Sequence, residues 1–111
     1  MKYNMKLNNE PFNKIKDGTK TIELRLNDDK RKLLNINDSI EFTNRDTNEK
    51  LLVNIIDLYK YSSFKELYNN FNKEELGYDK DEEASYKDME KYYSKEEQNK
   101  YGVVGIKIKK L

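Results

Sequence analysis

The spacing of the apolar residues changes twice along this chain, and that change limits the folds open to it. Apolar and polar residues alternate in Thr21–Leu26 and Ser39–Thr43, which is the pattern of strands with two unlike faces, and the largely apolar Leu51–Tyr59 is expected to be a longer strand. From Ser63 the spacing becomes helical, and in Val103–Lys109 it returns to alternation. Strands, then helices, then a returning strand predict an α+β layout in which a nearly closed β-barrel carries inserted short helices.

The expected helices are short, and each has its own start or stop signal. Asn9 is placed to begin one that ends at Gly18. The capping box S-x-x-E begins at Ser63 and again at Ser94, and Glu82–Tyr93 is expected to form a helix between them. These elements belong to the inserted part of the fold.

The chain has the length of one domain. Its 111 residues are 35% hydrophobic and 39% charged, so the core must be lean but can be built. No Pro/Gly-rich linker or repeat divides the sequence, and the apolar clusters continue to the C-terminal end. We expect a single domain over residues 1–111.

Cysteine and histidine are both absent, which excludes disulfides, thiolate zinc sites and a cysteine nucleophile. The usual ligands of transition metals and the commonest general base are missing as well. We therefore expect no metal and no cofactor. No apolar run approaches the roughly 20 residues that cross a bilayer, and the N-terminal stretch lacks the apolar core of a signal peptide. We expect a cytoplasmic protein without a membrane partner.

The net charge of +1 hides an uneven distribution. Residues 1–62 carry 12 basic and 10 acidic side chains, residues 63–100 carry 7 and 11, and residues 101–111 carry 3 and none. If a polyanion binds, the two basic portions should meet it while the acidic segment faces elsewhere or gates the site.

The strongest local motif is Gly18–Arg25, where a helix stop leads directly into a strand. Glu23 and Arg25 project from one face of that strand, and Lys20 stands where the strand begins, so the three can line one concavity. Together they offer a cation, a proton-accepting carboxylate and a planar fork for phosphate. The same pattern also fits the solvated face of an ordinary strand.

This G-x-K-x-x-E-x-R pattern resembles the signature of the ASCH (ASC-1 homology) family, whose fixed positions are met by Gly18, Lys20, Glu23 and Arg25. Two further blocks resemble the small bacterial members of the family, namely Ile36–Phe42, where Asn37 replaces a glycine, and the C-terminal region with Tyr92–Glu97 and Tyr101–Ile106. Asn tolerates the left-handed backbone for which a turn glycine is used. The resemblance covers nearly the whole chain.

The resemblance implies a PUA-like barrel with a cleft that binds nucleic acid or a nucleoside-like ligand. Some small relatives are amidohydrolases that deacylate modified cytidines with a motif Lys, a Thr three residues later and a distant Glu. Lys20 matches that Lys, whereas Glu23 occupies the position of the Thr, so the hydroxyl nucleophile is missing. Other relatives resemble RNA-binding proteins or ribonucleases.

Three hypotheses follow, and the residues leave open whether the protein is an enzyme. The first is RNA or nucleotide binding through Lys20, Arg25, Tyr93 and Tyr101, with a metal-independent ribonuclease as its catalytic form. In that form Glu23 would be the base, Arg25 the phosphate clamp and Lys20 the cation at the leaving group. The alternatives are an amidohydrolase acting on acylated nucleosides of the N4-acetylcytidine type, and a non-catalytic domain whose acidic helical segment contacts a protein partner.

Overall fold

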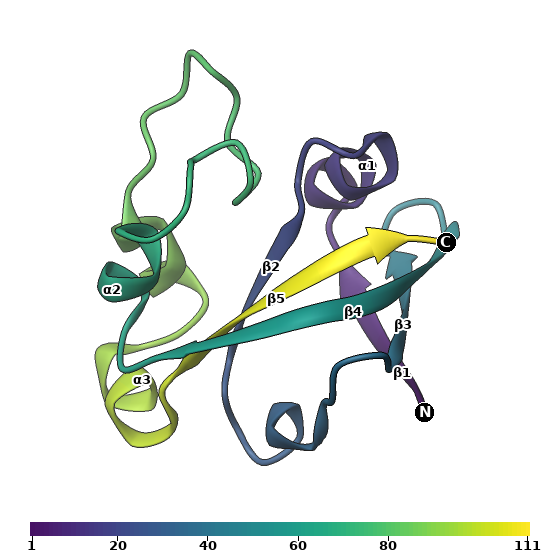
Figure 1. The fold of residues 1–111 in the computed structure, drawn as a ribbon. Coiled ribbons are helices and arrows are strands. Elements are labelled where there is room, and N and C mark those ends of the chain that lie inside the picture. Colours follow the sequence, from purple (N-terminus) through teal and green to yellow (C-terminus); the bar gives the residue numbers. More distant parts are fainter.

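Five strands form one mixed sheet that curls into a half-barrel, as the computed structural model of residues 1–111 shows (Figure 1). The order across the sheet is β1-β3-β4-β5-β2, so β1 and β2 are its two edges. The first pair, β1 with β3, is parallel, and the other three pairs are antiparallel. The strands are β1 (Lys2–Leu7), β2 (Ile22–Leu26), β3 (Ser39–Asn44), β4 (Lys50–Tyr61) and β5 (Val103–Lys110).

Short helices fill the connections between the strands. In Figure 1, α1 lies at one end of the sheet, while α2 and α3 lie together beside β4 and β5. The α-helices are α1 (Asn9–Asp17), α2 (Phe64–Tyr68) and α3 (Lys95–Tyr101), and two 3-10 helices cover Arg31–Leu33 (η1) and Tyr86–Lys91 (η2). No helix is both long enough and apolar enough to cross a membrane.

The curled sheet buries apolar side chains on both faces, so the protein has two cores. The barrel core fills the inside of the curl and includes Phe12, Phe42, Ile55 and Ile106. The outer core lies between β2 and the inserted helices and includes Ile22, Leu24, Phe64, Leu67 and Leu76. Nine partly buried residues, most of them tyrosines, surround the outer core. Aromatic side chains supply much of the buried area there, as a lean core requires.

Most of the predicted elements are present. The α+β barrel-like layout is confirmed, as are the β3–β4 hairpin and the capping box in which Ser94 and Glu97 bond each other's backbone nitrogen. Asn37 has a positive φ of 80°, which is the left-handed conformation expected where it replaces a glycine. The first helix was expected to have Asn9 as its N-cap, but the N-cap is Asn8 and Asn9 is the first helical residue.

Two parts of the fold differ from the expectation. The predicted helix Glu82–Tyr93 is wrong, because only η2 forms there. The Tyr78 hydroxyl contacts the Ser85 carbonyl oxygen at 3.2 Å and Asp88 at 2.7 Å, so a tertiary contact fixes this segment. Strand β1 was not predicted, although its residues Tyr3, Met5 and Leu7 alternate with polar residues.

The outer core can be tested with Leu24→Ala. Leu24 is 6% exposed, and its removal leaves a cavity beneath the inserted helices. We expect a loss of about 2–5 kcal/mol in the free energy of unfolding, measured by urea denaturation. Leu33→Ala is the matched control, because Leu33 is 62% exposed and its removal should change stability by less than about 1 kcal/mol. Equal effects of the two substitutions would contradict the outer core.

Candidate functional site

The strand that carries the motif is covered on both faces. Leu24 points into the outer core. Glu23 and Arg25 lie opposite Ile106 and Val104 of β5, which belong to the barrel core, so their side chains face the inside of the curl. The alternative interpretation of these residues as the solvated face of an ordinary strand is therefore wrong. The alternation showed that the two faces differ in polarity, but it could not show which one solvent reaches.

Glu23 is the centre of a buried chain of charges. Its Oε1 lies 3.1 Å from Lys20 Nζ, and its Oε2 accepts a hydrogen bond of 2.7 Å from Arg25 Nε. The side chains of Lys20 and Glu23 are only 9% and 5% exposed. Burial alone would raise the pKa of Glu23, but the Lys20 and Arg25 cations outweigh burial and lower it. The carboxylate is therefore held ionised.

The position of Lys20 depends on a segment far away in sequence. Gly77 lies so close that a Cβ atom there would come within 3.0 Å of Lys20 Cδ, and the positive φ of 103° at Gly77 also favours glycine. The Glu75 carbonyl oxygen accepts hydrogen bonds from the backbone nitrogens of Thr21 and Ile22. The segment around Gly77 thus covers Lys20 and the start of β2.

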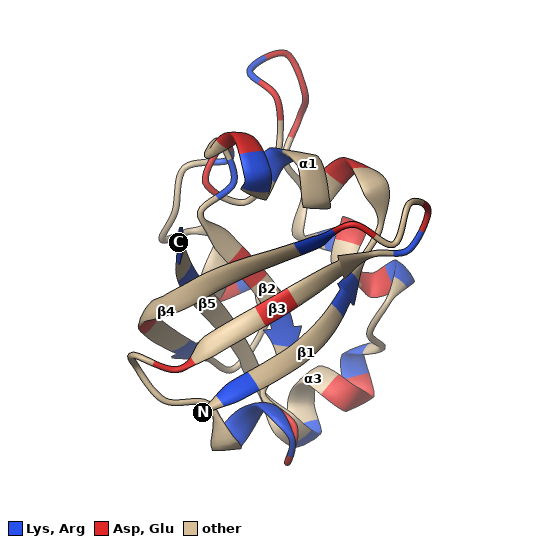
Figure 2. Ribbon diagram, turned by 90° about the vertical axis from the view of Figure 1, so that its right-hand side faces the viewer, with Lys and Arg blue, Asp and Glu red and all other residues tan.

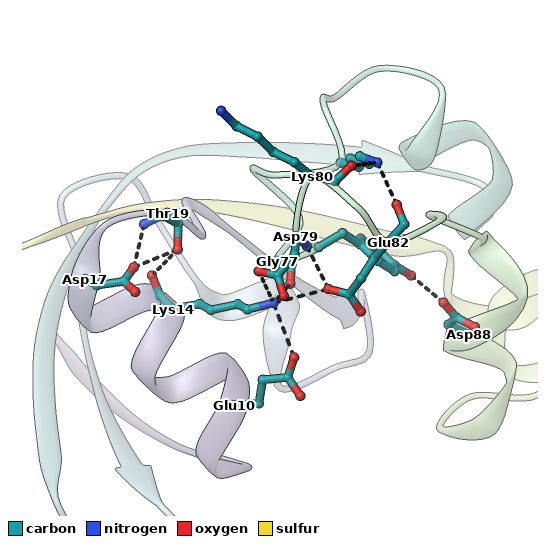
Figure 3. Close-up of polar contacts among 11 residues, drawn as sticks. Glu10, Lys14, Asp17, Thr19, Gly77, Asp79, Lys80, Glu82 and Asp88 are labelled. Carbon is teal, nitrogen blue, oxygen red and sulfur yellow. Dashed lines mark hydrogen bonds and ion pairs between the residues drawn. The ribbon is translucent and has the colours of Figure 1, made fainter.

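Lys14 holds that segment against α1. Its Nζ donates to the Gly77 carbonyl oxygen at 2.7 Å and lies within 3.5 Å of carboxylate oxygens of Glu10, Asp79 and Glu82 (Figure 3). These three carboxylates are exposed and close enough together to hold a metal ion. Because the Lys14 ammonium group already contacts all three, the protein offsets part of their charge with a cation of its own.

Arg25 bridges the two edges of the sheet. Its Nη2 donates to the Lys6 carbonyl oxygen on β1 at 3.1 Å, while its Nε remains on Glu23. Burial alone would lower the pKa of Arg25, but Glu23 and the Tyr93 hydroxyl outweigh burial and raise it. The guanidinium group is therefore fixed at the seam where β1 and β2 approach each other without pairing.

A cleft of about 700 Å³ opens above this seam. One part of its lining is charged and comes from the edge strands and the β3–β4 loop, with Lys6, Lys20, Glu23, Arg25 and Arg45. The other part comes from the inserted segment, which contributes four tyrosines together with apolar and charged side chains: Tyr68, Leu76, Gly77, Tyr78, Glu82, Asp88, Met89, Lys91, Tyr92 and Tyr93. A cleft that combines aromatic rings with fixed polar groups can hold a ligand.

Four of the five predicted site residues meet in this cleft. Lys20, Glu23, Arg25 and Tyr93 line it, whereas Tyr101 does not. Tyr101 packs against the outer core, with Lys100 Nζ 5.1 Å from its ring centre. Figure 1 shows its helix, α3, at the far end of the sheet from α1.

Sequence reasoning missed several lining residues of the inserted segment. Tyr92 is 63% exposed, and its ring is open to a ligand. Tyr78 is a link in a chain of polar groups, with its hydroxyl 2.9 Å from that of Tyr68 and 2.7 Å from Asp88 Oδ2. Burial, then Tyr68 and Asp88, raise the pKa of Tyr78, so its hydroxyl stays protonated. The only signal for these residues in the sequence was the high tyrosine content of the segment. Most of their contacts join loops, which have no regular spacing of residues.

Comparisons with known proteins agree with one another. The family model described as the ASCH domain matches residues 5–111. A crystal structure described as hypothetical protein PH0355 is 34% identical with a TM-score of 0.80, and the match covers 100% of both chains. The solution NMR structure of protein PF0455 from Pyrococcus furiosus is 32% identical with a TM-score of 0.72, covering 100% of this chain and 98% of that one. No curated protein matches.

The buried charge chain can be tested with Glu23→Gln. Removing the carboxylate leaves Lys20 and Arg25 buried without their counter-charge, which should cost about 3–5 kcal/mol of unfolding free energy at neutral pH. The folded-state pKa of Glu23 lies below its ordinary value of 4.5, so this stabilisation is present above pH 4.5 and is lost as the pH falls through the folded-state pKa.

Urea denaturation of both proteins at a series of pH values checks this. The stability difference between them should shrink below pH 4.5, and a difference that does not depend on pH would contradict the assignment. Glu41→Gln is the control, because its ion pairs with Lys2 and Lys50 are partly exposed and should contribute less than about 1 kcal/mol.

Proposed function

This chain belongs to the ASCH domain family of the PUA-like superfamily, to which RNA binding is ascribed, and we propose that it binds single-stranded RNA with one nucleotide seated in the cleft. The observation that carries the proposal is that cations from the two edges of the sheet, which we call the floor, and the tyrosines of the inserted segment, which we call the aromatic wall, line one cleft. Single-stranded RNA offers the matching pair of groups, since its phosphates are anionic and its unstacked bases have faces that stack on aromatic rings.

The floor suits a phosphate group. Arg25 uses Nε for Glu23 and Nη2 for the Lys6 carbonyl oxygen, so its guanidinium group is oriented before any ligand arrives. Arg45 and the Lys6 ammonium group line the same part of the cleft, and neither forms an ion pair within the protein. Preorganised cations lower the entropy cost of binding.

The wall suits a base. The exposed ring of Tyr92 and the partly buried ring of Tyr93 are neighbours at the edge of the cleft. Farther along, the Tyr68–Tyr78–Asp88 chain supplies hydroxyl groups and a carboxylate, which can meet the hydrogen-bonding edge of a base. We therefore assign Tyr92 and Tyr93 to stacking.

The lining argues against the amidohydrolase alternative. It contains no serine, threonine or cysteine, so an acyl-transfer nucleophile of the usual kind is missing from the cleft. The protein-interaction alternative required side chains to fill the cleft, and the cleft volume of about 700 Å³ argues against that.

The site also favours binding over cleavage. A general base should have a pKa near the working pH, whereas Lys20 and Arg25 lower the pKa of Glu23 and occupy both of its oxygens. We propose that Glu23 positions Arg25 and does not transfer a proton.

Tyr92→Ala tests the stacking role. Because the ring is exposed, we expect the protein to stay folded while the affinity for a labelled single-stranded 12-nucleotide RNA falls roughly 5- to 150-fold, measured by fluorescence anisotropy. Tyr101→Ala is the control and should leave the affinity of the folded protein nearly unchanged, since Tyr101 lies outside the cleft. A stronger effect at Tyr101 than at Tyr92 would refute the placement, and RNA binding no tighter than binding of a neutral polymer would refute the function.

A cleavage assay tests the positioning role of Glu23. We expect the same RNA to remain intact on a denaturing gel after prolonged incubation with the protein, with EDTA or without it. Fragments ending in 2′,3′-cyclic phosphate that form in EDTA, and that disappear with Glu23→Gln, would overturn the binding-only proposal in favour of a metal-independent ribonuclease. A Lys20→Met variant, in which the Glu23–Lys20 contact is removed, should be equally inactive.

A further inference from the structure

A second hollow joins the cleft at Arg25 and runs over the outer surface of β1. It has a volume of about 370 Å³ and shares three residues with the cleft, Lys6, Arg25 and Arg45. Six of the nine lining residues are cations and none is acidic, in a protein whose net charge is only +1. We call this hollow the basic groove.

The register of the sheet builds one side of the basic groove. Lys6 of β1 lies opposite Thr43 of β3, and Thr43 lies opposite Lys50 of β4, so the three form one row across adjoining strands. Figure 2 shows these strands side by side. Neighbouring strands are about 4.8 Å apart, so the row places two ammonium groups and a hydroxyl within reach of one extended ligand.

The other side comes from the segment that follows β2. Lys30 and Arg31 stand at the start of η1 and line the groove together with Arg25. The Arg31 side chain makes one hydrogen bond, from Nη1 to Asp28 at 3.2 Å, and its buried Nε has no partner. Cations from β1, β4 and this segment therefore converge although they are far apart in sequence.

Half of these cations are not used within the protein, because Lys6, Lys30 and Arg45 form no ion pair. Lys50 Nζ donates to Thr43 Oγ1 at 3.2 Å and has a long contact of 3.7 Å with Glu41. If these cations served only to stabilise the fold, we would expect them to be paired with carboxylates, because like charges placed together repel one another. A polyanion would relieve that repulsion and release the counterions that the cations hold.

We propose that the basic groove binds the phosphodiester backbone of the RNA segment that leaves the cleft. This inference rests on the proposed function, and it adds the path that the RNA takes as it leaves the cleft. The shared residues Lys6, Arg25 and Arg45 give the path continuity, because a chain whose nucleotide is seated in the cleft must pass them to enter the groove. The absence of an aromatic residue from the groove indicates contact with phosphates without base stacking.

The test uses the double variant Lys30→Gln/Lys50→Gln. Both residues are exposed and line the groove without lining the cleft. The loss of two phosphate contacts should reduce the magnitude of the slope of log K against log[salt] by about 1.4. At about 0.1 M salt, this loss should weaken binding of a single-stranded 12-nucleotide RNA roughly 25-fold. The control Lys65→Gln/Lys109→Gln makes the same change in net charge at exposed positions that line neither hollow, and it should leave the slope unchanged.

A second ligand separates this inference from the proposed function. Adenosine and cytidine 5′-monophosphates reach the cleft alone, and their affinity, followed by NMR chemical shifts, should be the same in the double variant and the wild type. If the wild type binds the mononucleotides but the two double variants have equal slopes with the 12-mer, the groove inference fails and the cleft proposal stands. If the wild type binds neither ligand, both fail. Binding to phosphatidylserine vesicles that the groove variant alone loses, without any effect on RNA, would assign the groove to a membrane surface and overturn the inference.

Discussion

The site depends on one buried carboxylate. Glu23 lies at the edge of the barrel core and binds a cation with each oxygen, and Arg25 reaches on from it to the backbone of β1. Each of these charges alone would be costly to bury, so each is tolerated only because the others are present. This chain spans the seam that backbone pairing leaves open, since β1 and β2 are both edges. The contacts that join the two edges of the half-barrel therefore also orient the Arg25 guanidinium group.

The inserted segment supplies what the barrel lacks. It buries the outer face of β2 through Phe64 and Leu67, and it supplies the aromatic wall of the cleft. Lys14 ties this segment to α1 through the Gly77 carbonyl oxygen (Figure 3), and Gly77 packs closely against the Lys20 side chain. Two acidic side chains of the inserted segment, Asp79 and Glu82, strengthen this attachment because both form ion pairs with Lys14. The wall and the floor of the cleft thus come from separate parts of the chain and are joined mainly by polar contacts.

The elements whose signals are local could be predicted from the sequence, and those formed by distant contacts could not. The alternation around Leu24 and the Ser94 capping box depend on residues close together in the chain, and both are present. The motif also located Lys20, Glu23 and Arg25 correctly beside one cleft. Their burial could not be foreseen, because it comes from Gly77 and from β5. The same holds for the pairing of β1 with β3, which joins residues nearly 40 positions apart, and for the Tyr78 contacts that replace a predicted helix.

Under the proposed function, the charge chain that orients Arg25 for a phosphate also makes Glu23 a weak base. Two cations in contact with a carboxylate stabilise its ionised form, which lowers its pKa and weakens it as a base. Freeing Glu23 for proton transfer would require breaking the contact with Arg25 Nε, and the guanidinium group would then lose its orientation and leave a buried charge unpaired. Proton transfer by Glu23 would therefore cost the interaction energy that holds Arg25 in place. A site in which positioning and proton transfer depend on one carboxylate can do one of them well, and here both contacts of Glu23 serve positioning.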